Sequence, residues 1–152
     1  MTASAKSILG PLESGSLRVV FLFVGQGEAT LLLIPDGNGG HTSMLVDCNR
    51  AMKLNGIDLA SLLRDLLSVP EEDGKPTLDY FVNTHPHKDH LGGLSNIREA
   101  VTIRSVWHSG HKPGKEHDGP YQELVELADE VRKAGGEVVE LVGSRTPIEM
   151  GT

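Results

Sequence analysis

Three histidines and an aspartate fall within the six residues of the segment HPHKDH, which runs from His85 to His90. His85 and His87 alternate, so in extended backbone both rings point to one side of the chain. A helix beginning after Lys88 would bring Asp89 and His90 back toward the same space. Imidazole nitrogens and carboxylate oxygens bind zinc, and manganese and iron accept the same ligands. The segment therefore predicts a metal site with His85, His87, Asp89 and His90 as ligands, better suited to two ions than to one.

An ordinary structural role is the alternative, because a single histidine is more often a surface or core residue than a ligand. The surroundings favour metal binding. Pro86 lacks a backbone donor and ends the hydrogen-bond ladder of the preceding strand, while Gly92 and Gly93 let the backbone pass close to a bound group. The histidines directly follow an apolar stretch, and α/β sheets bind ligands in the loops after their strands.

The rest of the sequence predicts an α/β fold in which helices cover a sheet. β-branched and aromatic runs indicate strands, and apolar residues at helical spacing indicate helices. The first strand is apolar without interruption, so we expect it to be buried on both faces. The predicted order is βββ-α-β-α-β-α-β, with strands at residues 17–25, 30–35, 42–48, 78–84, 102–108 and 137–142 and helices at 59–67, 91–100 and 120–134.

Composition limits the classes of function. The 152 residues suffice for one domain, and a formal net charge of −7 argues against tight, non-specific nucleic-acid binding, although bound cations would offset it in a nuclease. Cys48 is the one cysteine, which fits a reducing compartment. Residues 1–16 lack the features of a signal peptide and are expected to form a loose lead-in. No apolar run is long enough to span a membrane, so we expect a cytoplasmic protein.

The histidine segment also resembles a known family. THPHKDHLGGL is similar to the HxHxDH signature of the metallo-β-lactamase fold, an αββα sandwich. This resemblance implies that His85 and His87 hold a first metal and that Asp89 and His90 hold a second. It also implies that Asp89 orients or deprotonates the attacking water, and that Asp47 supports the ligands from behind. Two Zn²⁺ ions, or Mn²⁺ or iron in their place, are the implied cofactors.

Two upstream segments point to a branch of this family. FLFVGQGEATLLLIP and SMLVDCN resemble the VGQGDA and LLID pattern of the proteins related to ComEC/Rec2, which act in DNA uptake. Glu28 stands where this branch commonly has an aspartate, one methylene shorter. Cys48 stands where many relatives have a small residue, and we expect it to pack rather than to react.

The family pattern requires further ligands, an aspartate and at least one histidine, from the second half of the fold. We therefore expect residues 17–152 to form a truncated domain, the first αβ half with a few added elements. A missing C-terminal half or a partner chain would complete it; a fragment is favoured over a naturally short protein. His108, His111 and His117 lie in or beside a polar loop and are expected to be solvated, with a ligand role as the alternative. Trp107 is expected in the core or at a cleft lip.

The predicted function is metal-dependent hydrolysis with a dinuclear site that activates water, acting on phosphodiesters or related esters. The chain would supply the HxHxDH half of that site. A non-catalytic metal-binding or scaffold module is the alternative, and a small-ester or thioester substrate is a variant of the first hypothesis.

Overall fold

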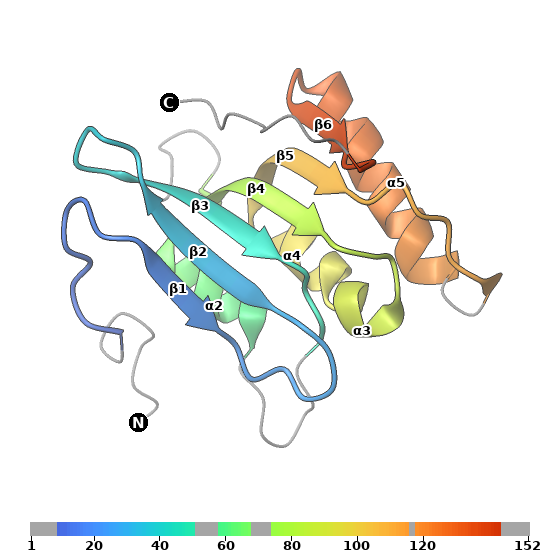
Figure 1. Cartoon of the computed structure of the whole chain (residues 1–152), viewed down its shortest axis with the longest axis horizontal. Helices are drawn as coiled ribbons and strands as arrows, with labels where there is room; N and C mark the ends of the chain where they lie inside the picture. Colours follow the sequence, from blue (N-terminus) through green and yellow to red (C-terminus); the bar gives the residue numbers. More distant parts are fainter. Residues whose placement is uncertain (1–8, 51–57, 68–73, 116–117, 144–152) are drawn as a thin grey trace.

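The computed structural model describes residues 9–50, 58–67, 74–115 and 118–143. They form one six-stranded sheet with helices packed on it (Figure 1), so the predicted α/β fold is confirmed. Most element bounds match the predicted ranges to within two residues. The elements are β1 (Arg18–Phe21), β2 (Thr30–Pro35), β3 (His41–Val46), α2 (Leu59–Leu66), β4 (Thr77–Asn83), α3 (Lys88–Leu91), α4 (Leu94–Ala100), β5 (Thr102–His108), α5 (Asp118–Lys133) and β6 (Glu137–Glu140).

The sheet has the strand order β1-β2-β3-β4-β5-β6. β1, β2 and β3 form an antiparallel meander, whereas β3, β4, β5 and β6 pair in parallel. Each parallel step requires a crossover, and α2, then α3 with α4, then α5 lie in the three crossovers. Consequently the C-terminal ends of β1, β3, β4 and β5 meet at one edge of the sheet, where the histidine segment follows β4.

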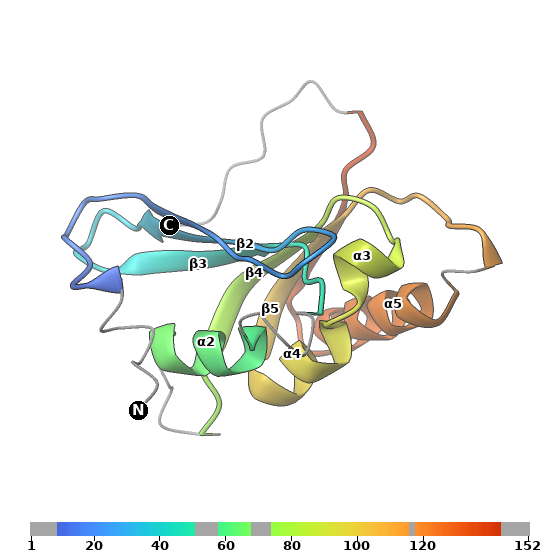
Figure 2. The ribbon, with the colours of Figure 1, turned by 90° about the horizontal axis from the view of Figure 1, so that it is seen from below.

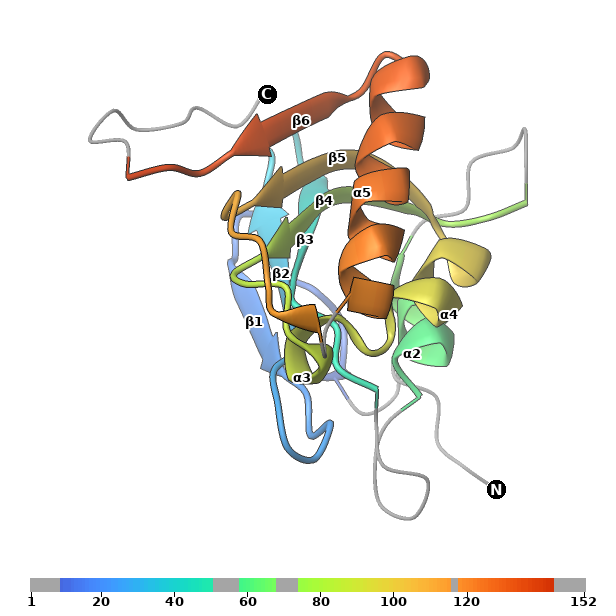
Figure 3. The same ribbon diagram turned by 90° about the vertical axis from the view of Figure 1, so that its right-hand side faces the viewer.

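The core lies between the sheet and the helices, which all cover the same face (Figures 2 and 3). Alternate strand residues point toward them, and each buried leucine or phenylalanine contributes about 1.5–3 kcal/mol relative to an exposed one. Asp58 caps the start of α2 by accepting a hydrogen bond from the backbone N–H of Ala60. The fully buried core side chains include Leu31, Leu45, Leu63, Phe81, Leu94, Ile97 and Val106.

The other face of the sheet is covered by no described helix (Figure 2). The prediction that the first strand is buried on both faces is therefore wrong. β1 is an edge strand whose burial alternates, and Phe21 and Phe23 are 81% and 64% exposed. Leu22 and Val24, which point the other way, are buried in the core. An apolar run alone does not distinguish a strand covered on both faces from one whose second face is open.

Residues 1–8 of the predicted lead-in lie outside the described residues, as do residues 144–152 at the other end of the chain. The described part of the lead-in contacts β1, because the Arg18 guanidinium donates hydrogen bonds to the backbone oxygens of Gly10 and Pro11. Among the described helices, none has the length and apolarity needed to cross a bilayer.

Candidate metal centre

The histidine segment turns sharply at the C-terminal end of β4. The strand ends at Asn83, and α3 begins at Lys88 with His87 as its N-terminal flanking residue in extended backbone. The backbone N–H of His87 donates to the oxygen of His85, and that of His90 donates to the oxygen of His87. The chain turns into a helix at Lys88, three residues before the predicted range 91–100, which the structure divides into α3 and α4. This early turn brings His90 back toward the first two histidines.

Three imidazole rings gather in this turn. The ring centroids of His85 and His90 lie 3.8 Å apart, and those of His85 and His87 lie 4.6 Å apart. The Asp89 carboxylate is close by, with Oδ2 3.6 Å from Nε2 of His90. The structure thus brings all four predicted ligands into one small region.

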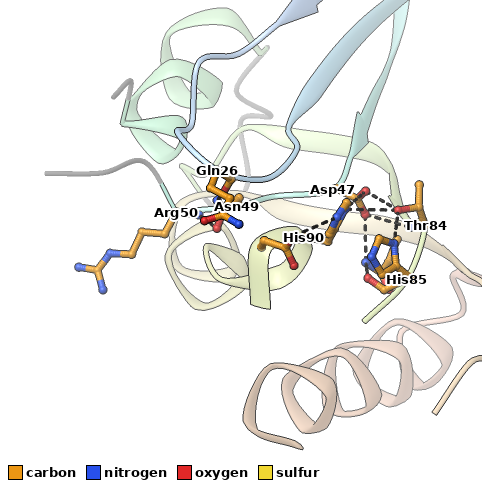
Figure 4. Close-up of polar contacts among 9 residues, drawn as sticks. Gln26, Asp47, Asn49, Arg50, Thr84, His85 and His90 are labelled. Carbon is orange, nitrogen blue, oxygen red and sulfur yellow. Dashed lines mark hydrogen bonds and ion pairs between the residues drawn. The ribbon is translucent and has the colours of Figure 1, made fainter. Parts of the chain in front are cut away.

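Asp47 is the buried carboxylate behind these rings. It follows β3, is 1% exposed, and adopts a φ of 55°, which directs its side chain toward the loop after β4. Its Oδ1 accepts hydrogen bonds from Asn83 Nδ2 at 3.0 Å and from Thr84 N at 2.9 Å, and its Oδ2 accepts from Thr84 Oγ1. Oδ2 also lies 2.7 Å from Nδ1 of His90 (Figure 4).

The contact between Asp47 and His90 fixes which ring nitrogen remains available. A carboxylate at Nδ1 favours the tautomer with its proton on Nδ1, which leaves the lone pair of Nε2 free to bind a cation. Burial lowers the pKa of His85 below that of an ordinary histidine, and the neighbouring His90 and His87 rings add to this effect. A lowered pKa favours the neutral form of the His85 ring, which is the form that binds metals, although Asp47 and Asp89 oppose the shift.

The loop between β1 and β2 packs directly against α3. The backbone N–H of Glu28 donates to the oxygen of Asp89, and the backbone N–H of Asn49 donates to the oxygen of Glu28. A Cβ atom on Gly27 would lie 2.0 Å from the Asp89 oxygen, so only glycine permits this approach. Asn49 also donates through Nδ2 to the oxygen of Gln26 (Figure 4). The Glu28 side chain is exposed beside the histidine segment.

The donor set suits a divalent cation, but the rings are not spread around a common point. Among the described residues, no group of three or more His, Cys, Asp or Glu side chains is arranged to enclose a metal ion. The His85 and His90 rings pack against each other instead, at the distance given above. The donor atoms fit a metal, because imidazole and carboxylate groups are typical ligands and Nε2 of His90 is free. To enclose an ion, the His85 and His90 rings would have to rotate apart.

The other histidines stand apart from this group to different degrees. Nδ1 of His108 accepts a hydrogen bond from the backbone N–H of Gly110 at 3.1 Å, so it serves its own loop. The exposed His111 ring lies 6.5 Å from the His87 ring, centroid to centroid. His117 lies outside the described residues.

The two remaining predictions for single residues concern Cys48 and Trp107. The Cys48 side chain is fully buried in the core, and burial together with the neighbouring Asp47 raises the pKa of its thiol, so its packing role is confirmed. Trp107 is 8% exposed, stacks edge to face on Tyr80, and donates through Nε1 to Glu137. It is a packed residue of the sheet.

Sequence reasoning missed two residues of the site, Asn83 and Thr84. Both hold the Asp47 carboxylate, and Thr84 Oγ1 also lies 3.2 Å from Nδ1 of His85. One signal was present in the sequence: Asn83 is a polar residue at a position where the alternation of β4 predicts an inward-facing side chain. The partner Asp47 is 36 residues away in the chain, so only the pairing of β3 with β4 makes the contact evident.

Comparisons with known proteins place this chain in a family. A family model described as Metallo-beta-lactamase superfamily matches residues 58–151, more than half of the chain. No curated protein matches. Among solved structures, an archaeal metallo-beta-lactamase superfamily protein from Sulfolobus tokodaii is similar at 16% identity and a TM-score of 0.38, over 89% of this chain and 51% of that chain. This chain thus spans about half the length of that relative. The six-stranded sheet and its helices are consistent with part of the fold of this family, and the chain belongs to the metallo-beta-lactamase superfamily.

Proposed function

We propose that this chain supplies the ligand-rich wall of a metal-dependent hydrolase, with His85, His87, Asp89 and His90 as ligands for two Zn²⁺ ions. The observation that carries the proposal is the gathering of three imidazoles over the buried Asp47 carboxylate, which leaves Nε2 of His90 free. Membership of a superfamily whose members are generally metal-dependent hydrolases supports it. Mn²⁺ and iron suit the same ligands. Zinc is proposed because imidazole and carboxylate groups are typical zinc ligands and because this superfamily typically binds divalent metals such as zinc.

The residues of the loop have distinct roles in this proposal. Rotation of the His85 and His87 side chains separates the two rings and points one nitrogen of each toward a shared cation. Asp47 keeps His90 in place through its contact with Nδ1. The Asp89 side chain, 45% exposed, orients the attacking water and accepts its proton. When bound, a divalent ion polarises the scissile group and makes water acidic enough to react at neutral pH.

Phosphodiesters or related esters are the proposed substrates. The support is the resemblance of the Gly25–Glu28 loop to the ComEC/Rec2-like branch, together with the packing of this loop against the Asp89 backbone. The net charge of −7 weakens attraction to a polyanion, and two bound dications would offset part of it locally. We propose a cytoplasmic location, because the single buried thiol suits a reducing compartment.

A second α/β half, in the same polypeptide or in a partner chain, is proposed to cover the open face of the sheet. The register aligns two rows of side chains across all six strands of that face. The row through Val82 runs next to the edge that carries the histidines, and the row through Tyr80 crosses the middle of the sheet. A covering half would thus bring its own loops over the histidines and add ligands. The mainly apolar rows are Val19, Leu32, Met44, Tyr80, Ser105 and Glu137, and Phe21, Thr30, Val46, Val82, Trp107 and Val139.

Zinc titration of the 152-residue chain by calorimetry tests the proposed ligands. We expect binding that is lost in His87→Ala and retained in His41→Ala, a matched control whose ring lies at the other end of the sheet beside the Ser16 oxygen. Equal affinity in the wild type and in His87→Ala would contradict the ligand assignment.

Hydrolysis is tested on the zinc-loaded protein with bis(p-nitrophenyl) phosphate. Asp89→Asn is expected to lower kcat by about 10²–10⁴-fold, the usual contribution of a positioned acid or base. Unchanged turnover in a variant that still binds metal would rule out the role given to Asp89.

A non-catalytic metal-binding or scaffold module is the second candidate. It is favoured by one observation, that no described group of three ligand side chains encloses an ion. A module of this kind would bind zinc weakly or not at all, and it would catalyse no hydrolysis even with the open face covered. Counting zinc per chain by atomic emission helps to separate the candidates: near two equivalents would show that this chain holds both ions without a second half, and no bound zinc would favour the scaffold module.

A further inference from the structure

Asn83 is a buried amide at a position where the fold normally requires an apolar side chain. It is the last residue of β4, is 1% exposed, and follows the buried Leu78 and Phe81 along the strand. The fully buried side chains of this sheet are otherwise mainly leucine, valine and phenylalanine. A buried polar side chain in such a place needs a specific reason, since removing an amide from water is costly unless its hydrogen bonds are replaced.

The amide nitrogen of Asn83 joins the two segments that build the candidate site. Nδ2 donates to Oδ1 of Asp47 at 3.0 Å and to the backbone oxygen of His85 at 2.9 Å. Both partners are acceptors only, so the orientation of the amide is fixed: its nitrogen, and not its oxygen, must face them. One side chain thereby ties the residue after β3 to the start of the histidine segment.

The amide oxygen of Asn83 has no such role. Oδ1 is buried, and no described residue donates a hydrogen bond to it. An unsatisfied buried acceptor lowers stability, whereas an apolar side chain of the same shape avoids that penalty. The amide oxygen therefore does not account for asparagine at this position, and the two hydrogen bonds made by Nδ2 do.

The hydrogen bonds to Asp47 divide between its two oxygens. Asn83 and the backbone of Thr84 hold Oδ1, while Oδ2 lies against Nδ1 of His90. With Oδ1 anchored, the carboxylate cannot turn away from His90 without breaking two hydrogen bonds. The same amide also holds the carbonyl of His85, and with it the backbone from which the His85 ring projects.

We propose that Asn83 is a positioning residue that locks the Asp47 carboxylate against His90 and fixes the His85 backbone, and so sets the direction in which both rings face a metal. The inference rests on the proposed metal site and adds a residue to it. Asn83 touches no metal and acts through Asp47. It leaves its own Oδ1 without a partner and orients the groups behind the ligands, as residues that support a metal site often do.

The substitution Asn83→Leu separates orientation from stability. Leucine has nearly the same shape, removes both hydrogen bonds and also removes the unsatisfied Oδ1. We expect its urea midpoint to lie at or below that of the wild type, because Asp47 Oδ1 and the His85 oxygen each lose a donor, while its zinc dissociation constant rises by about 10–100-fold. Asn83→Ala serves as the second variant if leucine does not fit, and Asn96→Leu, on an exposed position of α4, is the matched control.

A double-mutant cycle tests whether Asn83 acts through Asp47. In the Asp47→Ala background, Asn83→Leu is expected to change zinc affinity by no more than about twofold, because the group it orients is already absent. An equal loss in both backgrounds, or unchanged zinc affinity in Asn83→Leu with Asp47 intact, would overturn the inference. A loss of zinc affinity in proportion to a loss of stability would also overturn it, since Asn83 would then be merely structural.

The imidazole NMR spectrum of the metal-free chain distinguishes failure of the inference from failure of the proposed function. At pH 8 the wild type is expected to show His90 in the tautomer with its proton on Nδ1, and Asn83→Leu to show a mixture of tautomers. If the wild type binds no zinc, the proposed function fails, and this spectrum still decides the positioning role. An unchanged His90 spectrum in Asn83→Leu would refute that role, and a mixture would uphold it.

Discussion

At the scale of single residues, Asp47 organises the histidine edge more than any one histidine does. Its two oxygens contact the strand end, the loop and His90, and its φ of 55° is a conformation that side chains other than Gly, Asn and Asp seldom adopt. An aspartate at this position therefore tolerates the positive φ of the backbone and also supplies the carboxylate that contacts the His90 ring. Asn83 and Thr84 share this task, as described above.

Asp47→Asn changes the charge and keeps the shape and the tolerance for positive φ. We expect an unfolding free energy lower by about 1–3 kcal/mol, because one acceptor becomes a donor that faces other donors. Zinc affinity is expected to fall by about 10–100-fold. Asp79→Asn is the control: Asp79 accepts from Ser43 and Arg104 near the start of β4, so its loss should lower stability and leave zinc affinity unchanged. Equal zinc affinity in both variants would refute the role given to Asp47.

His108 predicts a specific dependence of stability on pH. Burial lowers its pKa, with Glu140 opposing and Arg132 adding to the shift, and Nδ1 must be unprotonated to accept from Gly110. In the window between the lowered pKa and the ordinary value of about 6.5, the unfolded chain binds more protons than the folded one. Stability therefore rises with pH through this window, and it is lost as pH falls through the folded pKa.

Urea unfolding measured from pH 7.5 downward checks this sign. His108→Asn removes the titrating group, so its stability should decline less steeply than that of the wild type as pH falls below about 6.5. Parallel curves for the two proteins would show that His108 does not carry the effect.

At the scale of elements, the site depends on a contact between the β1–β2 loop and the short helix α3. α3 has four residues, too few to be stable alone, and it is held by hydrogen bonds from Glu28 to Asp89 and from Cys48 to His90. Gly27 sits at the closest approach with a φ of 118°. The ligand-bearing helix is thus positioned by the loop of another element, and a change in that loop reaches the ligands.

Gly27→Ala should separate this contact from the general cost of positive φ. A Cβ at position 27 meets the Asp89 oxygen and Asn49, so the loop must move away from α3, and we expect lower stability together with weaker zinc binding. Gly37→Ala is the matched control, because Gly37 has a φ of 79° and open space around it. It should lose only about 1 kcal/mol and bind zinc normally. Similar zinc affinity in both variants would show that the loop does not position α3.

At the scale of the whole molecule, the sheet is covered on one face only. The helices bury one set of strand side chains, and the other face carries apolar side chains that remain exposed, among them Val19 and Phe21. Exposed apolar surface of this kind marks an interaction site or a tendency to self-associate. The open face adjoins the edge that carries the histidines, so the second half that we propose would lie over both.

Phe21→Ser tests the open face without touching the core. Because Phe21 is 81% exposed, its loss should change the unfolding free energy by no more than about 0.5 kcal/mol. Self-association of the chain, followed by sedimentation velocity, should decrease. Phe81→Ala, in the fully buried core, is the contrasting variant and should lose about 3–5 kcal/mol. Unaltered self-association in Phe21→Ser would mean that this face is not the apolar contact surface.

The sequence by itself determined the local features of this protein. The α/β order, the turn into a helix after Lys88 and the density of ligand residues at the end of β4 follow from periodicity, proline and glycine positions and side-chain chemistry, all of which act over a few residues. Burial of Cys48 was predicted from the lack of any activating neighbour, and the structure confirms it.

The tertiary structure decided what depends on distant contacts. Strand pairing brings Asp47 and Asn83 together across 36 residues, and no local pattern encodes that distance. The helices pack on one face of the sheet only. Phe21 points to the other face and is therefore exposed, although its strand is as apolar as a strand buried on both faces. Sequence periodicity shows which side chains are apolar. The packing of whole elements determines which of these side chains are buried within the described residues and which stay exposed on the open face.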